Sequence, residues 1–326
     1  MKAKERESIL NKSIPVLRDA LAISDDEIRI IVEKSIEGGE INSTDDFAGW
    51  IDGRFLSNCV LIDETGYAQM CVDALKILAT TAATDFGSSR QRDMGQLWAD
   101  MTRGYLGEYA FSLFLEKHWQ IKAKLGHEIG KLADYLPSDI QEIAFPKQES
   151  RPPKINIGIK TAKWNGIWMD IPGDQFNHSD VHILVKVNAG RDHLFAFFKS
   201  ISVFRDKILK HGESIGSISR EESASLFERL PSLKPIPAYI AGFVLKDKEY
   251  PLLSYSGVKG RTNYKISGWN GYYAQSDLDE IKAKENVKGK VEFAGIGQFT
   301  AANRYIFNTG SLSWKKDEWE MIIGRL

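Results

Sequence analysis

The chain lacks the features that mark disulfide-rich secreted proteins and membrane-spanning proteins. It has only two cysteines among 326 residues, Cys59 and Cys71. So few thiols, together with an amino terminus that has no apolar leader segment, argue against a disulfide framework and indicate a reducing compartment. No apolar run approaches the roughly 18 residues that a membrane span needs. We therefore expect a cytoplasmic protein that has no membrane partner.

A strong net charge is also missing. Lysine and arginine together number 43 against 44 aspartates and glutamates, which gives a formal net charge of −1. A protein that coats nucleic acid without specificity is usually basic overall, so any DNA binding here must use local basic patches. Hydrophobic residues make up 43% of the chain, which is enough for one large core or two smaller ones.

Several familiar catalytic and cofactor motifs are absent as well. There is no G-x-S-x-G nucleophile motif and no phosphate-binding P-loop. The pair Gly295 and Gly297 lacks the third glycine of a dinucleotide fingerprint, because residue 300 is threonine. His178 and His182 have a spacing that suits zinc only on a helix, and here we expect the start of a strand.

The pattern of apolar residues divides the chain into a helical part and a part rich in strands. Up to about residue 120 the spacing predicts helices, including residues 66–83 and 93–119. From about residue 136 short β-prone runs alternate with Gly, Pro and Asn. We predict strands at 137–143, 155–164, 181–188, 194–199, 237–246, 291–297 and 304–307, and helices at 200–210, 219–230 and 311–326. The fold class is therefore α/β (α+β), with a helical N-terminal region at 1–92 and a second domain at 93–326.

The most informative feature is an acid on one predicted strand and a lysine on the next. Asp139 lies in the predicted strand at 137–143. Lys160 lies in the predicted strand at 155–164, which begins Ile155-Asn156-Ile157-Gly158-Ile159-Lys160-Thr161. Residues two apart share a face of a strand, so Lys160 shares one with Gly158 while the isoleucines face the core. If the two strands pair as a hairpin, Asp139 and Lys160 can meet across it.

An acid beside a lysine suits the hydrolysis of phosphodiesters. Asp139 and other oxygen ligands would hold Mg²⁺, which prefers octahedral oxygen coordination and acidifies a bound water. Lys160 would orient or deprotonate that water, or stabilise the charge that develops on the phosphate. The plain alternative is that Asp139 caps a turn and Lys160 is an ordinary surface residue.

These motifs resemble the PD-(D/E)XK nuclease superfamily, and within it the type II restriction endonucleases. Ser138-Asp139 stands for the first acid of the family pattern, and Gly158-Ile159-Lys160 for its acid-x-lysine element. The segment 104–111 resembles the family's helix that places a glutamate, here Glu108, near the metal. The segment 180–187 resembles its next core strand. The resemblance implies a mixed β-sheet core flanked by helices and a homodimer that cuts a short palindrome.

The sequence departs from the family pattern at Gly158, where a second carboxylate is expected. Glu108 is the first candidate to supply it, Glu142 the second and Asp170 the third. Glu142 lies on the wrong face of its strand unless a bulge re-aims it. The main-chain carbonyl of Ile159 is a further possible metal ligand, because carbonyl oxygens suit a hard cation.

Three basic segments are candidates for DNA contacts. The segment 147–163 includes Lys154 and Lys163 beside the proposed site. The segment 255–265, with Trp269-Asn270-Gly271-Tyr272-Tyr273 after it, is the predicted recognition loop, because arginine and asparagine can contact base edges. The segment 86–93 is a third candidate. The residues concerned are Arg90, Arg92, Lys154, Lys163, Lys259, Arg261, Asn263 and Lys265. Solvated charges in ordinary loops or a hairpin are the alternative in each case.

We therefore expect a Mg²⁺-dependent, sequence-specific endonuclease that acts on double-stranded DNA as part of a restriction system. Its catalytic residues would be Asp139, Lys160 and Glu108, with Asp139, Glu108 and Ile159 as metal ligands. One alternative is a repair or junction nuclease that recognises DNA structure. Another is a DNA-binding protein that does not cut, and a third is a globular protein unrelated to nucleic acid.

Overall fold

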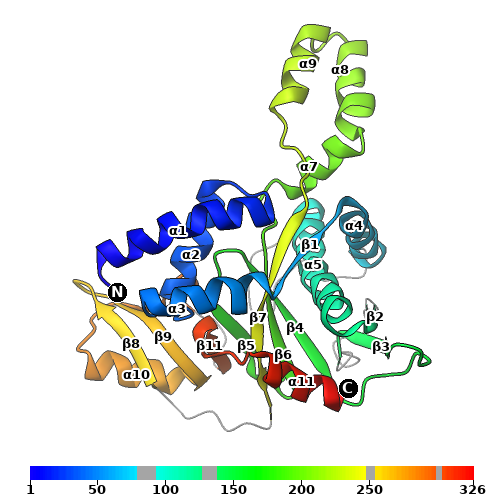
Figure 1. The fold of residues 1–326 in the computed structure, drawn as a ribbon. Coiled ribbons are helices and arrows are strands. Elements are labelled where there is room, and N and C mark those ends of the chain that lie inside the picture. The colour runs from blue at the N-terminus through cyan, green and yellow to red at the C-terminus, as the bar shows by residue number, and fades with distance from the viewer. Residues whose placement is uncertain (79–92, 127–137, 247–253, 299–302) are drawn as a thin grey trace.

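The computed structural model describes residues 1–78, 93–126, 138–246, 254–298 and 303–326 (Figure 1). Its helices are α1 (Ala3–Leu21), α2 (Asp25–Glu37), α3 (Thr44–Ala48), η1 (Gly49–Leu56), α4 (Glu64–Leu78), α5 (Met94–Trp119), α6 (Gly173–Phe176), α7 (His193–Ser200), η3 (Phe204–Leu209), α8 (Lys210–Ser214), α9 (Arg220–Arg229), α10 (Gln275–Lys284), η4 (Thr309–Ser311) and α11 (Lys316–Arg325). Its strands are β1 (Cys59–Ile62), β2 (Lys122–Leu125), β3 (Ile140–Ala144), β4 (Ile157–Lys163), β5 (Trp168–Pro172), β6 (Val181–Val187), β7 (Ile236–Leu245), β8 (Ser254–Lys259), β9 (Tyr264–Tyr273), β10 (Val291–Phe293) and β11 (Arg304–Asn308).

A mixed four-stranded sheet with the order β1-β7-β6-β4 forms the centre of the fold. β4 runs parallel to β6, whereas β7 runs antiparallel to both β6 and β1. Every residue of β6 is buried, because helices cover both faces of the sheet. The predicted mixture of helices and mixed sheet is thus confirmed.

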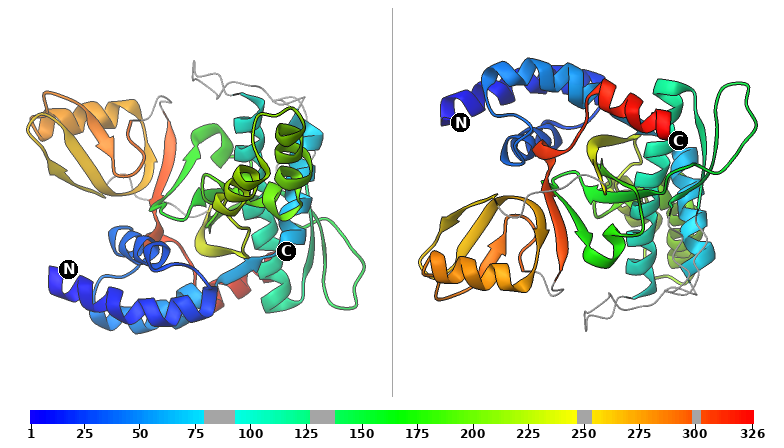
Figure 2. Two further views of the ribbon diagram at one scale, coloured as in Figure 1. Left: turned by 90° about the horizontal axis from the view of Figure 1, so that it is seen from above. Right: turned by 90° about the horizontal axis from the view of Figure 1, so that it is seen from below.

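Two hydrophobic clusters lie on the opposite faces of this sheet. Ile183 and Val185 of β6 pack with α5 and α11, while Leu184 packs with α1, α2 and η1. The alternation follows from the two-residue period of a strand. The N-terminal helices are therefore one layer of the central structure, as Figure 2 shows from two sides. The predicted domain boundary at residue 92 lies outside the described residues.

A second sheet has the order β10-β9-β11-β5, with β8 paired to β9. It encloses a third hydrophobic cluster, in which Trp269 and Tyr273 are fully buried. β2 and β3 form a separate antiparallel pair beside α5. The helices α8 and α9 project away from the rest of the molecule, next to α7 (Figure 1).

The strand predicted at 194–199 is wrong, since α7 occupies this segment. The buried residues of α7 are His193, Ala196 and Phe197, spaced three and four apart as in a helix, whereas Phe195 is exposed. A short, nearly continuous apolar run of this kind is compatible with either a buried strand or a helix, and here the spacing of the buried residues is helical. The predicted recognition loop at 255–265 is also regular, because most of it belongs to the hairpin of β8 and β9.

A buried ionic cluster joins the N-terminal helices to the central sheet. Glu40, between α2 and α3, accepts a hydrogen bond from Lys186 of β6 at 2.8 Å. The Trp50 indole N–H donates to the Glu40 carboxylate at 3.0 Å, and the Tyr239 hydroxyl donates to the same carboxylate at 2.7 Å. Arg54 lies 4.0 Å from the same carboxylate.

Arg54 extends the cluster to the C-terminal part of the chain. Its guanidinium donates to the carbonyl oxygens of Ala241 at 2.9 Å and Thr309 at 2.6 Å. The side chains of Glu40 and Lys186 are both 0% exposed, so water does not screen this pair. Burial by itself would raise the pKa of Glu40, but the charges and hydrogen bonds around it lower that pKa to about 2.

Of the described helices, none combines the length and apolar character that would let it cross a membrane. The expectation of a cytoplasmic protein stays a prediction.

We predict that Glu40→Gln lowers the free energy of unfolding at pH 7 by about 3–5 kcal/mol, because it leaves two buried cations without their anion. Chemical unfolding followed by circular dichroism measures the effect. Glu37→Gln is the control, since Glu37 makes a partly exposed pair with Lys34 and such pairs contribute about 1 kcal/mol or less.

The wild-type protein and Glu40→Gln should also differ in how their stability depends on pH. The pKa of Glu40 is lowered from 4.5 to about 2 on folding. Its stabilising contribution is therefore present above pH 4.5 and is lost as the pH falls toward 2. The difference between wild type and Glu40→Gln should shrink over this range. A difference that stays constant there would contradict the assignment.

Candidate functional site

Asp139 lies directly before β3 and bonds to the edge of β4. Its main-chain N–H donates to the carbonyl of Ile157 at 2.8 Å. Its carboxylate accepts from the main-chain N–H of Ile159 at 2.5 Å. The preceding Ser138 hydroxyl accepts from the N–H of Ile157 at 3.2 Å. Ser138 and Asp139 therefore hold the first strand of the motif against the second.

The predicted hairpin between these strands does not form. β3 pairs with β2 and bridges to Arg151, and β4 pairs with β6. Asp139 nevertheless comes close to β4, through hydrogen bonds at the start of the strand rather than across a regular ladder. Asp139 is therefore close to β4 because Ser138 and Asp139 bond to its main chain, and not because β3 pairs with β4.

The Ile159 carbonyl shares an edge of β4 with Asp139. The N–H groups of Ile157 and Ile159 both point toward the Ser138-Asp139 segment. In a strand, the N–H and C=O of one residue point to the same side, and every second residue repeats that direction. The carbonyl of Ile159 therefore projects on the edge that faces Asp139, where a main-chain ligand was predicted.

Lys160 is half-buried, and its ammonium donates a hydrogen bond to the side-chain oxygen of Gln175 at 2.7 Å. Burial lowers the pKa of Lys160, and the carboxylates of Asp139, Asp170 and Glu108 act against this shift in that order. All three acids thus influence the lysine electrostatically. The charges of the predicted acid, lysine and helix glutamate therefore interact, while their convergence on one metal position stays a prediction.

Glu108 belongs to α5, which packs on β4 because a glycine lies where the two elements meet. A Cβ on Gly107 would come within 1.9 Å of the Thr161 hydroxyl oxygen, and that hydroxyl donates to the carbonyl of Gly104. Burial and then the carboxylates of Glu108, Asp73 and Asp139 raise the pKa of Tyr105. Tyr105 of α5 is therefore near enough to Glu108 and Asp139 for their charges to affect it.

The two other candidates for the missing acid have different partners. Glu142 is bonded to Lys124 at 3.3 Å and to Ser150 at 3.0 Å, on the exposed side of β3. Asp170 is bound by both ends of the Arg304 guanidinium fork, at 2.5 and 2.7 Å. Which of the three supplies the missing acid stays a prediction.

Gly158 lies where a side chain has no room. An added Cβ would be 2.8 Å from the Ser179 hydroxyl oxygen and 2.9 Å from His182 Nδ1. His182 is the register partner of Gly158 on β6. The position at which the family pattern expects a carboxylate is therefore filled by side chains from the neighbouring strand and the segment before it.

Among the described residues, no group of three or more His, Cys, Asp or Glu side chains is arranged to hold a metal ion. The predicted ligand set consists of two acidic side chains, Asp139 and Glu108, and the main-chain carbonyl of Ile159. The assignment of Mg²⁺ stays a prediction.

The predicted DNA-contacting residues are spread over the surface. Arg90 and Arg92 lie outside the described residues. Lys154 and Lys163 are exposed at the two ends of the segment that contains β4. Lys259, Arg261, Asn263 and Lys265 lie at the exposed end of the β8–β9 hairpin.

Two of these hairpin residues also have structural partners. The Lys259 ammonium donates to the carbonyl of Glu285 at 2.6 Å. The Asn263 side-chain oxygen accepts from the N–H of Lys290 at 3.1 Å. Arg261 and Lys265 are therefore the stronger candidates for contacts with DNA.

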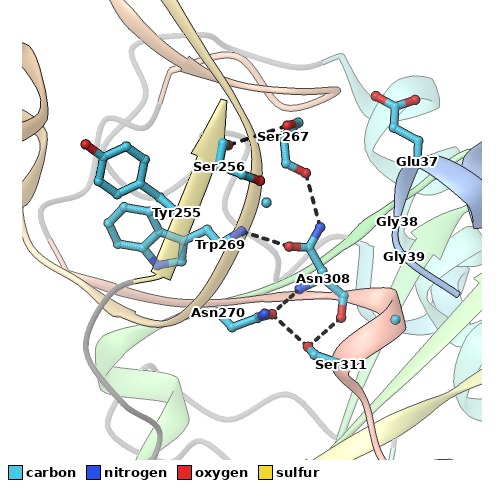
Figure 3. Close-up of a pocket in the computed structure, with 12 residues that line it drawn as sticks. Glu37, Gly38, Gly39, Tyr255, Ser256, Ser267, Trp269, Asn270, Asn308 and Ser311 are labelled. Atoms are coloured by element: carbon cyan, nitrogen blue, oxygen red, sulfur yellow. Dashed lines mark hydrogen bonds between the residues drawn. The ribbon is translucent and has the colours of Figure 1, made fainter. Parts of the chain in front are cut away.

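A polar pocket of about 490 Å³ lies at the base of the same hairpin. Its walls come from the end of α2, from β8 and β9, and from the β11–η4 junction (Figure 3). The Asn270 side-chain oxygen accepts from the Asn308 N–H at 2.9 Å and the Ser311 hydroxyl at 2.7 Å. These bonds hold one wall in place. Neither Asp139 nor Lys160 lines the pocket, so it is separate from the acid–lysine site.

Sequence reasoning missed Gln175, Arg304 and His182 as parts of the site. His182 lies in the predicted downstream strand and Gln175 shortly before it, and the sequence near them carries no signal of their proximity to Gly158 and Lys160. Arg304 is 134 residues from its partner Asp170. Only the pairing of β11 with β5 brings them together.

Comparison with protein-family models, curated proteins and solved structures finds no match for this chain. The site geometry and the sequence motifs are therefore the basis of the functional proposal below.

We predict that Gly158→Ala lowers the free energy of unfolding by about 1–3 kcal/mol, because the new methyl group displaces Ser179 and His182 in a packed interior. Thermal or urea unfolding measures this. Gly104→Ala is the matched control, since a Cβ at Gly104 meets no atom within 4 Å. In a helix that change should be neutral or stabilising by about 0.5–1 kcal/mol. Equal effects at the two glycines would contradict the crowding at residue 158.

Proposed function

We propose that the protein is a metal-dependent endonuclease of the type II restriction class, which hydrolyses phosphodiester bonds of double-stranded DNA at a specific sequence. The observation that carries the proposal is the contact between the Asp139 carboxylate and β4 at Ile159, directly before the half-buried Lys160. An acid and a lysine at one strand edge, with a glutamate acting from the adjacent helix, suit phosphoryl chemistry.

The order of elements supports the resemblance to the PD-(D/E)XK nucleases. A long helix with Glu108 precedes the acid-bearing β3 and the lysine-bearing β4. β6 follows at the position of the expected next core strand and lies beside β4 in parallel orientation. A restriction-endonuclease-like core is the proposal that accommodates this order.

The residues at the site fit a divalent cation. Asp139 and Glu108 offer carboxylates and Ile159 a main-chain carbonyl, and hard cations prefer such oxygen donors. When bound, a divalent cation such as Mg²⁺ supplies Lewis acidity for a phosphate oxygen and acidifies a water molecule.

The other steps fall to the side chains themselves. Lys160, oriented by Gln175, stabilises the negative charge that develops on the phosphate or orients the attacking water. Asp139 is positioned by Ile159 rather than by solvent, so little reorganisation accompanies the reaction. Arg304 fixes Asp170 and adds positive charge near Lys160.

DNA binding would use the exposed cations of the hairpin turn and of the segment around β4. A homodimer is the natural arrangement for a palindromic site, because a two-fold protein matches a two-fold target. A DNA-binding protein that does not cut is the second candidate, favoured by Gly158, where crowding prevents a carboxylate from replacing the glycine.

We predict that the wild-type protein cuts plasmid DNA into discrete bands with Mg²⁺ or Mn²⁺. Asp139→Asn and Lys160→Ala should each lower the cleavage rate by about 100-fold or more, because each removes a group that acts on the reacting phosphate. Glu142→Gln is the control, since this acid faces solvent and its partners Lys124 and Ser150. Gel electrophoresis of time courses gives the rates.

Three results would change this proposal in different ways. Cleavage that survives in Asp139→Asn would overturn the site. Preference for branched DNA would favour a structure-specific nuclease. Salt-dependent binding by a wild-type protein that cuts with neither metal would favour the DNA-binding protein.

We further predict that replacing Lys259, Arg261 and Lys265 together by Ala weakens DNA binding and its dependence on salt. Each phosphate contact that is lost should reduce the slope of log K against log[salt] by about 0.9. Fluorescence anisotropy at several salt concentrations measures both. The control variant replaces Lys4, Arg6 and Lys12 by Ala. It loses the same amount of positive charge, from the exposed side of α1. If both triple variants lose the same affinity, the hairpin is not a specific contact.

A further inference from the structure

Three parts of the chain that are far apart in sequence form the polar pocket at the base of the β8–β9 hairpin. They are residues 37–39 at the end of α2, the paired strands β8 and β9, and the segment from the end of β11 to η4 (Figure 3). The volume of about 490 Å³ lies within the range of small-molecule sites. The pocket is therefore large enough for a single ring-sized ligand.

Close main-chain contacts and a side-chain amide hold the walls of this pocket in place. A Cβ on Gly310 would lie 2.2 Å from the Gly39 carbonyl oxygen, so η4 and the end of α2 pack backbone against backbone. The Gly310 N–H donates to the carbonyl of Gly38 at 2.8 Å. On the other wall, the Asn308 side-chain oxygen accepts from the main-chain N–H of Trp269 at 2.8 Å. The pocket is therefore preformed.

Three side chains that line the pocket have hydrogen-bonding atoms that no other described residue uses. The Asn270 side-chain oxygen already accepts two hydrogen bonds, whereas its amide nitrogen makes none within the described chain. The Ser256 hydroxyl likewise has no partner among the described residues. One oxygen of the Glu37 carboxylate accepts from Lys34, and the other is available. The lining thus offers an amide donor, a hydroxyl and a carboxylate oxygen.

The charge of the lining is unsuitable for an anion. Among the described residues that form the walls there is no lysine, arginine or histidine, and Glu37 contributes a negative charge. A phosphate group would therefore lack a cation in the pocket and would be repelled by the carboxylate. The pocket suits a neutral polar ring that both donates and accepts hydrogen bonds.

The wall that β8 and β9 contribute continues along one face of the hairpin toward its turn. Ser256 and Val258 are two residues apart on β8, so they share a face, and their register partners are Gly268 and Lys265. A Cβ on Gly268 would lie 2.4 Å from the Ser256 hydroxyl oxygen, which places both on the pocket side. Lys265, opposite Val258, is therefore about 7 Å along the strand from the edge of the pocket.

The end of the hairpin beyond the pocket is cationic. Four exposed cations lie at the turn or on the segment bonded to it: Arg261, Lys265, Lys288 and Lys290. That segment is held at the turn because the Lys290 N–H donates to the Asn263 side chain. Glu292 of β10 is the register partner of Lys265 and offsets part of this charge. The hairpin is thus positive at its turn, whereas its base has an acid and no cation among the lining residues.

A nucleotide has the matching distribution of charge, with an anionic phosphate and a neutral, hydrogen-bonding base. We propose that the pocket binds a nucleobase of a DNA strand whose phosphates lie on the cationic turn. The inference rests on the proposed function, because it takes DNA as the partner. A base reaches such a pocket only from a single strand or after it leaves the stack of a duplex.

The groups in the pocket suit cytosine and adenine better than thymine. Both of these bases carry an exocyclic amino group, which the available oxygen of Glu37 accepts, as acidic side chains do from cytosine. The Asn270 amide donates to a ring nitrogen or carbonyl of the base. Thymine presents a carbonyl oxygen where cytosine has its amino group, so its carbonyl would face the carboxylate. The pocket therefore distinguishes bases by the amino group.

The test uses the full-length protein and single strands of about 12 nucleotides, a length typical of single-strand sites. Fluorescence anisotropy in EDTA, which prevents cleavage, compares strands of dC, of dA and of dT. The dC and dA strands should bind about 5–10-fold more tightly than the dT strand, the low end of what a paired base contact gives. Equal affinity for the three strands, or no binding to any of them, would overturn the inference.

Two variants assign this preference to the pocket. Asn270→Asp keeps the oxygen that accepts from Asn308 and Ser311 but removes the donor amide, so the preference for dC over dT should fall below about 2-fold. Ser256→Ala removes an exposed hydroxyl and should reduce the preference less. Asn11→Asp is the matched control, because it adds the same charge at an exposed position on α1. A preference that persists in both folded pocket variants would contradict the assignment.

Free nucleosides separate the pocket from the rest of the strand. In titrations followed by nuclear magnetic resonance, deoxycytidine should bind in preference to thymidine, and more weakly than the dC strand because it lacks the phosphates. Deoxycytidine that binds as tightly as the strand would overturn the role of the cationic turn.

Failure of the nuclease proposal has a different signature. If the base preference depends on Asn270 but no DNA is cut, the pocket stands and the proposed reaction does not. If DNA is cut in an Asp139-dependent way while the three strands bind equally, the reaction stands and the pocket does not bind a base.

Discussion

The buried cluster around Glu40 is the interaction on which the rest of the structure depends. A fully buried carboxylate is tolerable only with cations and donors around it. Lys186, Arg54, Trp50 and Tyr239 provide them from three separate parts of the chain. The cluster therefore fixes the N-terminal helices on one face of β6 and β7. The hydrogen bond from Arg54 to the carbonyl oxygen of Thr309 ties η4 to the same cluster.

The position of β6 carries this constraint to the candidate site. Lys186 and His182 are four residues apart on β6, so both project on the same face of the sheet. The pairing of β4 with β6 places His182 beside Gly158. β4 pairs with β6 along seven residues, from Ile157 to Lys163. Asp139 contacts the opposite edge of β4, through the main-chain N–H of Ile159.

Local patterns in the sequence were sufficient where periodicity and burial agree. The alternation of isoleucines in 155–159 predicted that Lys160 and Gly158 share a face, and β4 has Ile157 and Ile159 buried in one cluster. The long helical pattern at 93–119 corresponds to α5, bounded by the Asp93 cap. The same approach was wrong at 194–199, where a short aromatic run concealed a helical period. It also missed β1, β2, β5, β8 and β9. The prediction of helices up to about residue 120 is wrong at β1, a four-residue strand that joins the central sheet through β7. Glycines and polar residues weaken the strand pattern of β8 and β9.

The sequence by itself determined the type of elements, the mixed α and β class, and the residues with suitable chemistry. These follow from side-chain periodicity and functional groups, which are local properties. Only the tertiary structure decided that β4 pairs with β6 instead of β3, that Asp170 is bound by Arg304, and that His182 fills the space over Gly158. Each of these depends on segments that are distant in sequence and are brought together by burial of the sheet's two faces. The apparent defect at Gly158 is therefore a packing relation between two strands, and such a relation has no signature along a single chain.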